Sequence, residues 1–565
     1  MSQLSIAEIT ALDKRVDSGI DSFAALAVPK PVMAIHLLRF YEDYLRLYAP
    51  KLASGNIDDY LAARKEAQDG LHFAMLWVMQ RCPPSEDVDL SLQDDAYTLC
   101  WPLFQGAIQY SRVWDLLTLL FRARVFGEWE SSDHVRLRYS DELASEFDVA
   151  GRLVAAPDPP GLADRIGPAF SAMEELILKL QPRSIGGGKV EYNLSPDVFA
   201  RMKTIHLDLL NHLWELDPNW DFGGYTLGQF REVWLALVAF AAAHQRVCFR
   251  SGAEGIGLAS VVPVKRTDRW EKSIVRWSSV PRTTVSTILR DLTFTQELYA
   301  PGRRQPDITC QPFFPLGRDL VALSGSLLLD SNAERNLWDL LSIIRPALHS
   351  TLRNKKEEYW VQALTGWLSN YGLTCGGRIP VQMGSEKTDL DLMILDRARG
   401  FGLGCQLKWL TAPDRIRDVE YTDKELLVGV DQAELSRRWL TTKPASLISR
   451  LGITDQELAD MRFEVAVLSK NALGSSLVYR RAPNVPVITE RLLMWVLGEP
   501  HRASLQTLWK VANNRSYFGI PNIHYCDENA EAQFAGVHFT GEALGMRLCQ
   551  LWTPEADIKL PDGER

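Results

Sequence analysis

Three polar side chains in the stretch DLDLMILDRARGFGLGCQLKW, residues 389–409, have the types that metal-assisted chemistry needs: Asp391, Gln406 and Lys408. A carboxylate and an amide carbonyl are oxygen ligands of the kind that Mg²⁺ or Mn²⁺ accepts. A lysine beside such a metal can position a water molecule and offset the charge that develops on a phosphate. The set therefore predicts metal-assisted cleavage of a phosphodiester, with Asp391 and Gln406 as metal ligands.

Two strands joined by a short loop would position these residues. The runs 389–395 and 401–409 are rich in apolar residues, and DRARG between them suits a hairpin loop. Because the side chains of a strand alternate between two faces, Gln406 and Lys408 share a face with two glycines, and the opposite face is apolar. Glycines leave room for a close approach. We expect this polar face to be open at a sheet edge, with Asp391 opposite Gln406.

The segment 345–490 resembles the PD-(D/E)xK nuclease superfamily, whose restriction-endonuclease-like core runs helix, three strands, helix, strand. Its signature places an acid on the first helix, an Asp at the second strand and (D/E)xK on the third. KKEEYWVQALTGWLSNYG at 355–372, TDLDLMIL and QLK follow that order. The patterns of a helix at 423–440 and of strands at 463–469 and 485–489 continue it.

The resemblance implies a role for each matching residue. Asp391 and Gln406 would hold the metal, and Lys408 would act on the water and on the transition state. Gln432 sits where several branches of the superfamily carry a glutamine near the site. This sequence departs from the signature at Gln406, where an Asp or Glu is usual. A neutral amide lowers metal affinity, and the QxK form occurs both in active branches and on the way to inactive ones.

The helix acid of the resemblance would be Glu357 or Glu358. Glu357 is favoured because it lies seven residues before Leu364 and so shares a helix face with that core residue. The alternative for both is an ordinary solvated helix start.

The length of 565 residues predicts several domains, since one core does not grow to that size. We expect a multidomain α+β protein. A mainly helical recognition or regulatory region would cover 1–245, and a basic mixed α/β connecting region would cover 246–344. A nuclease-like α/β domain with a mixed central sheet would follow at 345–500, and a C-terminal extension at 501–565.

The stretch 246–290 is basic, with nine Lys and Arg against three acids, and Trp270 and Trp277 lie within it. Basic side chains contact phosphates and aromatic rings stack on bases. The alternative is a solvated surface with tryptophans in the core. The candidate nucleic-acid contacts are Lys265, Arg266, Arg269, Lys272 and Arg276 of this stretch, together with Gln432.

The bulk composition indicates a cytoplasmic protein without a membrane span. The net charge is −9, and none of the eight cysteines forms a CxxC pair. We therefore expect reduced thiols rather than disulfides or a zinc site. The N-terminus lacks the pattern of a signal peptide. The longest apolar run, VWLALVAFAAAHQ at 233–245, predicts a buried helix.

We expect a Mg²⁺- or Mn²⁺-dependent nuclease that acts on DNA, and the resemblance suggests a bacterial restriction or anti-phage effector. Nucleic acid would be its main partner, and the helical N-terminal region would bind a protein or a second copy of the chain. One alternative is an inactive nuclease fold that serves as a nucleic-acid-binding or scaffold module. Another is a helical interaction protein whose C-terminal sheet is unrelated to nucleases.

Overall fold

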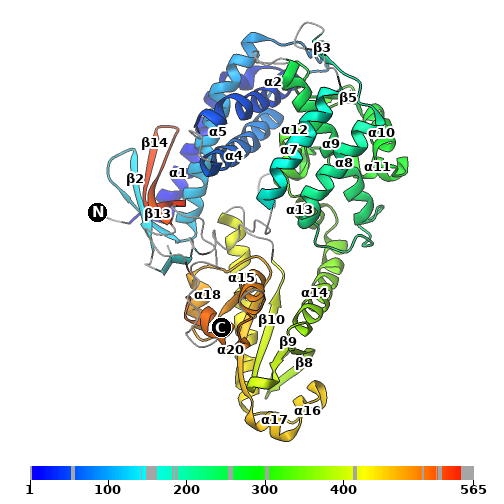
Figure 1. Ribbon diagram of the computed structural model, residues 1–565. Helices are drawn as coiled ribbons and strands as arrows, with labels where there is room; N and C mark the ends of the chain where they lie inside the picture. Colours follow the sequence, from blue (N-terminus) through cyan, green and yellow to red (C-terminus); the bar gives the residue numbers. More distant parts are fainter. Residues whose placement is uncertain are drawn as a thin grey trace.

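The chain is a multidomain α+β protein in a computed structural model, and helices make up most of it (Figure 1). The structure describes residues 3–52, 57–140, 143–144, 146–147, 150, 162–180, 183–184, 189–251, 259–299, 305–410, 416–498, 502–516, 518 and 525–548.

Buried hydrophobic side chains form three clusters. The N-terminal cluster runs from Leu4 to Leu137 and takes in further residues between Cys248 and Leu327 and between Ala532 and Phe539. The middle cluster runs from Met173 to Leu352. The sheet cluster runs from Trp360 to Ala512 and adds Phe147 and Ala150.

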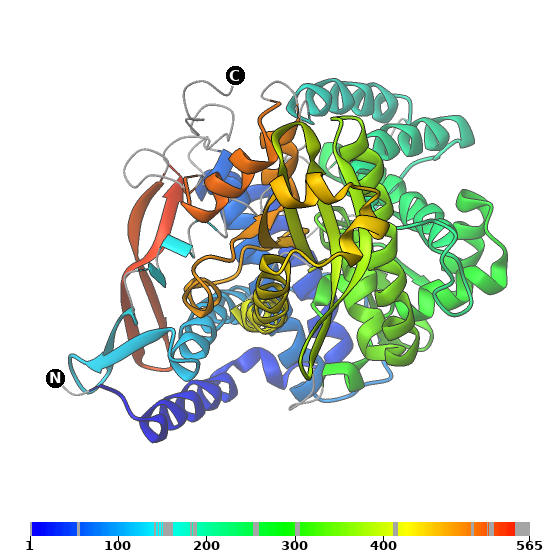
Figure 2. The same cartoon turned by 90° about the horizontal axis from the view of Figure 1, so that it is seen from below.

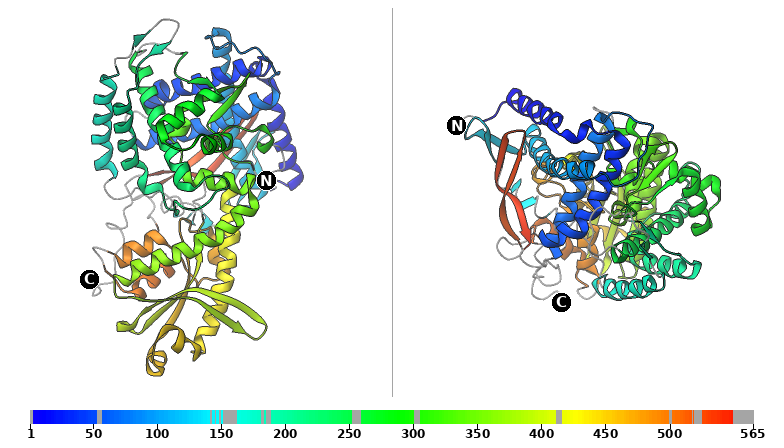
Figure 3. Two further views of the ribbon diagram at one scale, coloured as in Figure 1. Left: turned by 90° about the vertical axis from the view of Figure 1, so that its right-hand side faces the viewer. Right: turned by 90° about the horizontal axis from the view of Figure 1, so that it is seen from above.

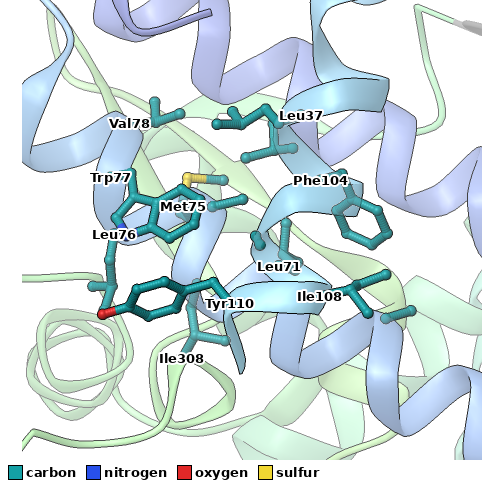
Figure 4. Packing of buried hydrophobic residues seen from close by; sticks show 14 of the residues in the cluster. Leu37, Leu71, Met75, Leu76, Trp77, Val78, Phe104, Ile108, Tyr110 and Ile308 are labelled. Carbon is teal, nitrogen blue, oxygen red and sulfur yellow. The ribbon is translucent and has the colours of Figure 1, made fainter. Parts of the chain in front are cut away.

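Helices α2 (Lys30–Asp43), α4 (Ile57–Arg81) and α5 (Asp94–Phe121) form most of the N-terminal cluster. Figure 4 shows Leu37 of α2, Met75 of α4 and Phe104 of α5 packed together, with Ile308 from a distant segment at their edge. Asp94 and Asp95 lie in the first turn of α5, where acidic side chains suit the positive end of the helix dipole. The shorter helices here are α1 (Ile6–Ser18) and α3 (Ala49–Leu52).

A four-stranded sheet beside these helices joins segments from both ends of the sequence. Its strand order is β1 (Val125–Trp129), β2 (His134–Tyr139), β14 (Val537–Leu548), β13 (Tyr525–Phe534). Strands β2 and β14 pair in parallel, and Figure 1 shows the hairpin of β13 and β14 beside β2. The predicted C-terminal extension is therefore divided: α20 (Leu505–Asn513) packs in the sheet cluster, and the hairpin in the N-terminal cluster.

The middle cluster surrounds α9 (Leu227–Ser251). This helix contains the apolar run at 233–245, so the predicted buried helix is confirmed. Among the described helices it is the one that passes a length and hydropathy test for a membrane span, but most of that window is buried in the protein. Its neighbours are α7 (Leu162–Leu178), α8 (Pro196–Leu210), α10 (Thr267–Ser278), α11 (Arg282–Asp291), α12 (Gly325–Leu329) and α13 (Ala333–Ile344).

Residues 246–344, predicted as a connecting region, divide between the N-terminal and middle clusters. Strands β5 (Val264–Arg266), β7 (Leu320–Leu323) and β6 (Phe313–Gly317) form a small antiparallel sheet at this division. A separate two-residue pair is formed by β3 (Arg183–Ser184) and β4 (Val190–Glu191).

Helix α14 (Pro346–Ser369) runs from the middle cluster into the sheet cluster, as Figure 3 shows. Its Leu352 belongs to the middle cluster, and its Trp360, Leu364 and Leu368 belong to the sheet cluster. Glu357 lies between these two sets, so the predicted helix acid is placed at the junction.

The sheet cluster is built on a five-stranded mixed sheet, in the order β12 (Val487–Thr489), β11 (Arg462–Ser469), β10 (Phe401–Lys408), β9 (Glu386–Asp396), β8 (Thr374–Met383). Strands β8, β9 and β10 are antiparallel, and β10, β11 and β12 are parallel. Figure 2 shows this sheet from below. The accompanying helices are α15 (Ile416–Thr441), α16 (Ser446–Leu451), α17 (Asp455–Asp460), α18 (Ser476–Arg481) and α19 (Glu490–Leu497).

Strand β10 is the central strand of this sheet, and the expected open face at a sheet edge is wrong. Residues 401–407 are all buried. The face with Gln406 and Lys408 packs against α15, which covers it. The space beside the two glycines is filled: a Cβ at Gly402 would meet Phe463 at 2.6 Å, and one at Gly404 would meet Leu390 at 2.9 Å.

Candidate active site

Asp391 is fixed where the pairing of β9 with β10 ends. The last paired residues are Leu392 and Cys405. Beyond them the Asp391 Oδ2 accepts a hydrogen bond of 2.8 Å from the backbone N–H of Leu407. The carboxylate thus takes the place of a ladder carbonyl. Burial raises the pKa of Asp391, and the Leu407 hydrogen bond and the charge of Lys408 oppose that rise.

Lys408 ends β10 and points toward α15. Its Nζ donates to the Gln432 Oε1 at 3.4 Å. The Lys408 side chain passes over Gly429, and a Cβ added at Gly429 would lie 3.0 Å from the Lys408 Cε. Gln432 therefore lies at the site, as the sequence predicted, and it orients the lysine. Gly429 was not singled out from the sequence, although a glycine within a predicted helix is a usable signal. Glycine destabilises a helix interior, so its presence there indicates a close packing contact.

Glu357 of α14 is partly buried, and among the described residues it has no hydrogen bond or ion pair. Burial raises its pKa, Lys408 lowers it, and Asp391 raises it again. The three charges are therefore close enough to interact. Glu358 is exposed and pairs with Arg378 at 3.0 Å, so Glu357 is the acid that faces the site.

Gln406 is only 1% exposed. Its Nε2 donates to the Asp389 carbonyl at 2.7 Å, and the Ser436 Oγ on α15 lies 3.5 Å from the same nitrogen. The amide nitrogen thus ties β9 to the middle of the sheet. Only the carbonyl oxygen of this side chain could serve a metal.

A pocket between the middle and sheet clusters opens beside Lys408 and Glu357. Helix α14 lines it with His349, Arg353 and Lys356 as well as Glu357. The remaining walls come from α13, from the end of β10 and from α15: Arg335, Trp338, Asp339, Trp409, Leu410, Asp418, Tyr421, Thr422 and Glu425.

The donors at this site fit Mg²⁺ or Mn²⁺ in type. Mg²⁺ is commonly held by one or two carboxylates, with waters and substrate phosphates completing its shell. Asp391 and Glu357 supply two carboxylates whose pKa values are both raised by burial, and a bound cation would favour their ionised forms. Within the described ranges, no group of three or more His, Cys, Asp and Glu side chains is placed to hold a metal by itself.

The five basic candidates lie on β5 and α10, two elements that are away from α15 and β10 in Figure 1. The Lys265 Nζ is enclosed by aromatic rings, 4.4 Å from the centroid of Trp270 and 5.1 Å from that of Trp277. Both tryptophans pack with the middle cluster. The other four candidates, Arg266, Arg269, Lys272 and Arg276, are exposed.

Of the residues predicted for the site, Glu357, Asp391 and Lys408 lie within electrostatic reach of one another, and Gln432 contacts the lysine. Gln406 lies next to them but is held by the backbone of β9. Comparison of the chain with protein-family models, with curated proteins and with solved structures found no match.

Proposed function

We propose that this protein is a metal-dependent nuclease that hydrolyses phosphodiester bonds in DNA. The observation that carries the proposal is the approach of Glu357, Asp391 and Lys408, which come from α14, β9 and β10, beside an open pocket. Two partly buried carboxylates and the ammonium at the end of β10 are groups that suit metal-assisted attack on a phosphate.

The order of elements supports the same proposal. Helix α14, strands β8 to β10, helix α15 and strand β11 follow one another as helix, three strands, helix, strand. This is the order of the restriction-endonuclease-like core that the sequence resembles. By extension of that resemblance, the role we propose is a cytoplasmic restriction or anti-phage effector.

The side chains divide the chemistry between them. Asp391 and Glu357, with the carbonyl of Gln406, would hold the metal, which polarises the phosphate and lowers the pKa of water when bound. The Leu407 N–H fixes the Asp391 carboxylate in place. Lys408, held by Gln432, would donate to a non-bridging phosphate oxygen and offset the charge that develops there.

An inactive nuclease fold that binds nucleic acid is the second candidate, and the burial of Gln406 favours it. An amide whose nitrogen is committed to the Asp389 carbonyl has a clear structural role. Such a role would keep the glutamine in the fold after the metal was lost.

Cleavage assays on plasmid DNA, linear DNA and RNA with Mg²⁺ or Mn²⁺ separate these candidates. We expect the wild type to cut DNA and Lys408→Ala, Asp391→Ala and Glu357→Gln to lose at least about a hundredfold in rate, as removal of a transition-state donor commonly does. Glu358→Gln and Asp389→Asn are matched controls, since each neutralises an exposed neighbour on the same element.

Undiminished cleavage in the Lys408 and Asp391 variants would place the activity elsewhere. Binding of DNA without cleavage by the wild type under every metal condition would support the inactive fold instead.

A further inference from the structure

Two lysines lie against the ring of Trp409, the residue that follows Lys408. The Nζ of Lys356 is 4.6 Å from that ring centroid and 4.5 Å from the centroid of Trp338. The Nζ of Lys470 is 5.2 Å from the ring of Trp409. Both ammonium groups are thus held by aromatic faces where the middle and sheet clusters meet.

The two lysines differ in their anionic partners. Lys470 forms an ion pair with Glu490, and Glu215 lies 3.9 Å away on another side. Lys356 is 7% exposed, yet within the described part of the chain its Nζ has neither a hydrogen-bond acceptor nor a carboxylate at ion-pair distance. An ammonium with little exposure to water is stabilised by such a partner, because aromatic faces do not accept its three N–H groups as strong hydrogen bonds.

Lys356 lines the same pocket as Glu357 and Lys408, so a ligand in that pocket can reach it. Four cations line the pocket, Arg335, Arg353, Lys356 and Lys408, and four acids, Asp339, Glu357, Asp418 and Glu425. Their formal charges cancel, 4 − 4 = 0. With the carboxylate of Asp391 beside the pocket counted as well, a bound divalent metal would leave one positive charge, 0 − 1 + 2 = +1, which favours an anionic ligand.

We propose that Lys356 forms an anion subsite that binds a phosphate group of the nucleic-acid strand, next to the phosphodiester at Lys408. The subsite rests on the proposed function for its ligand, and it adds a second point of contact along the strand. The phosphate belongs either to an internal linkage or to a strand end. Trp338 and Trp409 hold the ammonium in place before the strand arrives, which lowers the ordering cost of binding.

Salt dependence of DNA binding tests this role, because each phosphate contact adds to the slope of log K against log salt. The full chain is titrated, without divalent metal, against a short labelled DNA duplex at several salt concentrations. We expect Lys356→Met to bind roughly tenfold more weakly at low salt and to lower the slope by about one contact. Lys356→Arg keeps the charge and should keep the slope.

The matched control is Lys355→Met, which removes an exposed lysine from the same helix. It should leave the slope at the wild-type value. A Lys356→Met protein that folds but shows the wild-type slope would overturn the subsite, since a purely structural lysine stabilises the fold without contacting phosphate. If Lys356→Met fails to fold, Lys356→Arg takes its place, and a slope that falls by one contact although the charge is kept would overturn the subsite equally.

Two further arms separate the possible outcomes. Duplexes with a 5′-phosphate, a 5′-hydroxyl and a closed circle show whether the phosphate is terminal or internal. A wild-type chain that binds none of these nucleic acids would contradict the proposed function itself. A chain that binds and cuts DNA with an unchanged slope in Lys356→Met would contradict the subsite alone.

Discussion

Gly429 determines where the ammonium of Lys408 can lie. The added Cβ of Gly429→Ala would sit 3.0 Å from the Lys408 Cε and 3.3 Å from a methyl group of Val467. Because the lysine is the more flexible neighbour, we expect it to move away from Gln432 and cleavage to fall by about tenfold or more. Stability should change little, since alanine is the better helix former by up to about 1 kcal/mol. Cleavage rates and thermal unfolding measure the two effects.

Gly366→Ala is the matched control for this change. Gly366 lies within α14, and a Cβ there meets no atom within 4 Å. It should raise the free energy of unfolding by up to about 1 kcal/mol and leave cleavage unaltered. Equal cleavage by Gly429→Ala and the wild type would mean that the position of Lys408 does not limit the reaction.

Residue types and strand alternation singled out Asp391, Gln406 and Lys408 as candidates, and the resemblance added Glu357 or Glu358. The structure places Glu357 within electrostatic reach of Asp391 and Lys408. Gln406 and Lys408 do share a face of β10, as alternation predicts. Alternation does not reveal what covers a face, so the burial of Gln406 under α15 could not be predicted. Lys356 looks like any other solvated lysine in KKEE until the fold places it between two tryptophans.

At the scale of elements, α15 is held by the N-terminal region. Arg124, in the loop after α5, donates to the Asp423 Oδ2, and Asp423 also accepts from the Ser475 N–H at 2.8 Å. The Asp423 side chain is 5% exposed. The same helix carries Gln432 and Gly429, so the N-terminal region fixes the element that orients Lys408.

We expect Arg124 and Asp423 to be energetically coupled. A double-mutant cycle with Arg124→Met and Asp423→Asn, followed by urea unfolding, should give a coupling of about 1–3 kcal/mol, because either single change leaves a poorly compensated buried group. Arg122 and Glu420 form an exposed ion pair between the same two elements. Their cycle should give less than about 1 kcal/mol. Equal couplings for the two pairs would contradict a special role for Asp423.

Elements with strong periodicity were predicted closely, and irregular ones were not. The runs 401–409 and 463–469 became β10 and β11 with shifts of one residue. Strand β8 was missed because TCGGRIPVQM contains two glycines and a proline, residues that weaken a strand pattern and are tolerated at an edge. The pairing of β14 with β2 was missed because it joins segments that are far apart in the sequence.

On the scale of the whole molecule, Glu42 joins the N-terminal and middle regions. This fully buried carboxylate of α2 accepts hydrogen bonds from the Gln245 Nε2 at 2.7 Å and from the Ser326 N–H at 3.0 Å. Burial raises its pKa from 4.5 to about 7, although the Ser326 hydrogen bonds oppose the rise. The folded protein therefore binds this proton more tightly than the unfolded chain does.

The resulting stability is fully present below pH 4.5 and is lost as the pH rises to about 7. Glu42→Gln removes the titrating group. The difference in unfolding free energy between wild type and variant should therefore fall by about 3 kcal/mol over that interval. Urea unfolding followed by circular dichroism at a series of pH values measures it. Glu86→Gln, at an exposed glutamate, should give a flat difference. If the difference in unfolding free energy for Glu42→Gln also stays constant with pH, burial does not raise the pKa of the Glu42 carboxyl.

Domain boundaries were the least predictable feature at this scale. Composition along the chain marks where the pattern changes, but the clusters draw on segments that are distant in sequence. The predicted unit 246–344 is split because Cys248 and Phe314 pack with the N-terminal cluster, and Trp270 and Leu328 with the middle cluster. This division of one segment between two clusters follows from tertiary packing, and the local sequence pattern does not indicate it.

The parallel pairing of β2 with β14 sets an order for folding during translation. The β2 strand ends at Tyr139, and β14 begins at Val537, which is 537 − 139 = 398 positions later. At the usual 5–20 residues per second a nascent chain waits about 20–80 s to make this pair. By then the whole sheet cluster has been translated, and the edge of β2 has stayed unpaired and open to association with other chains. The four-stranded sheet is therefore completed only after the strands of the sheet cluster have been translated.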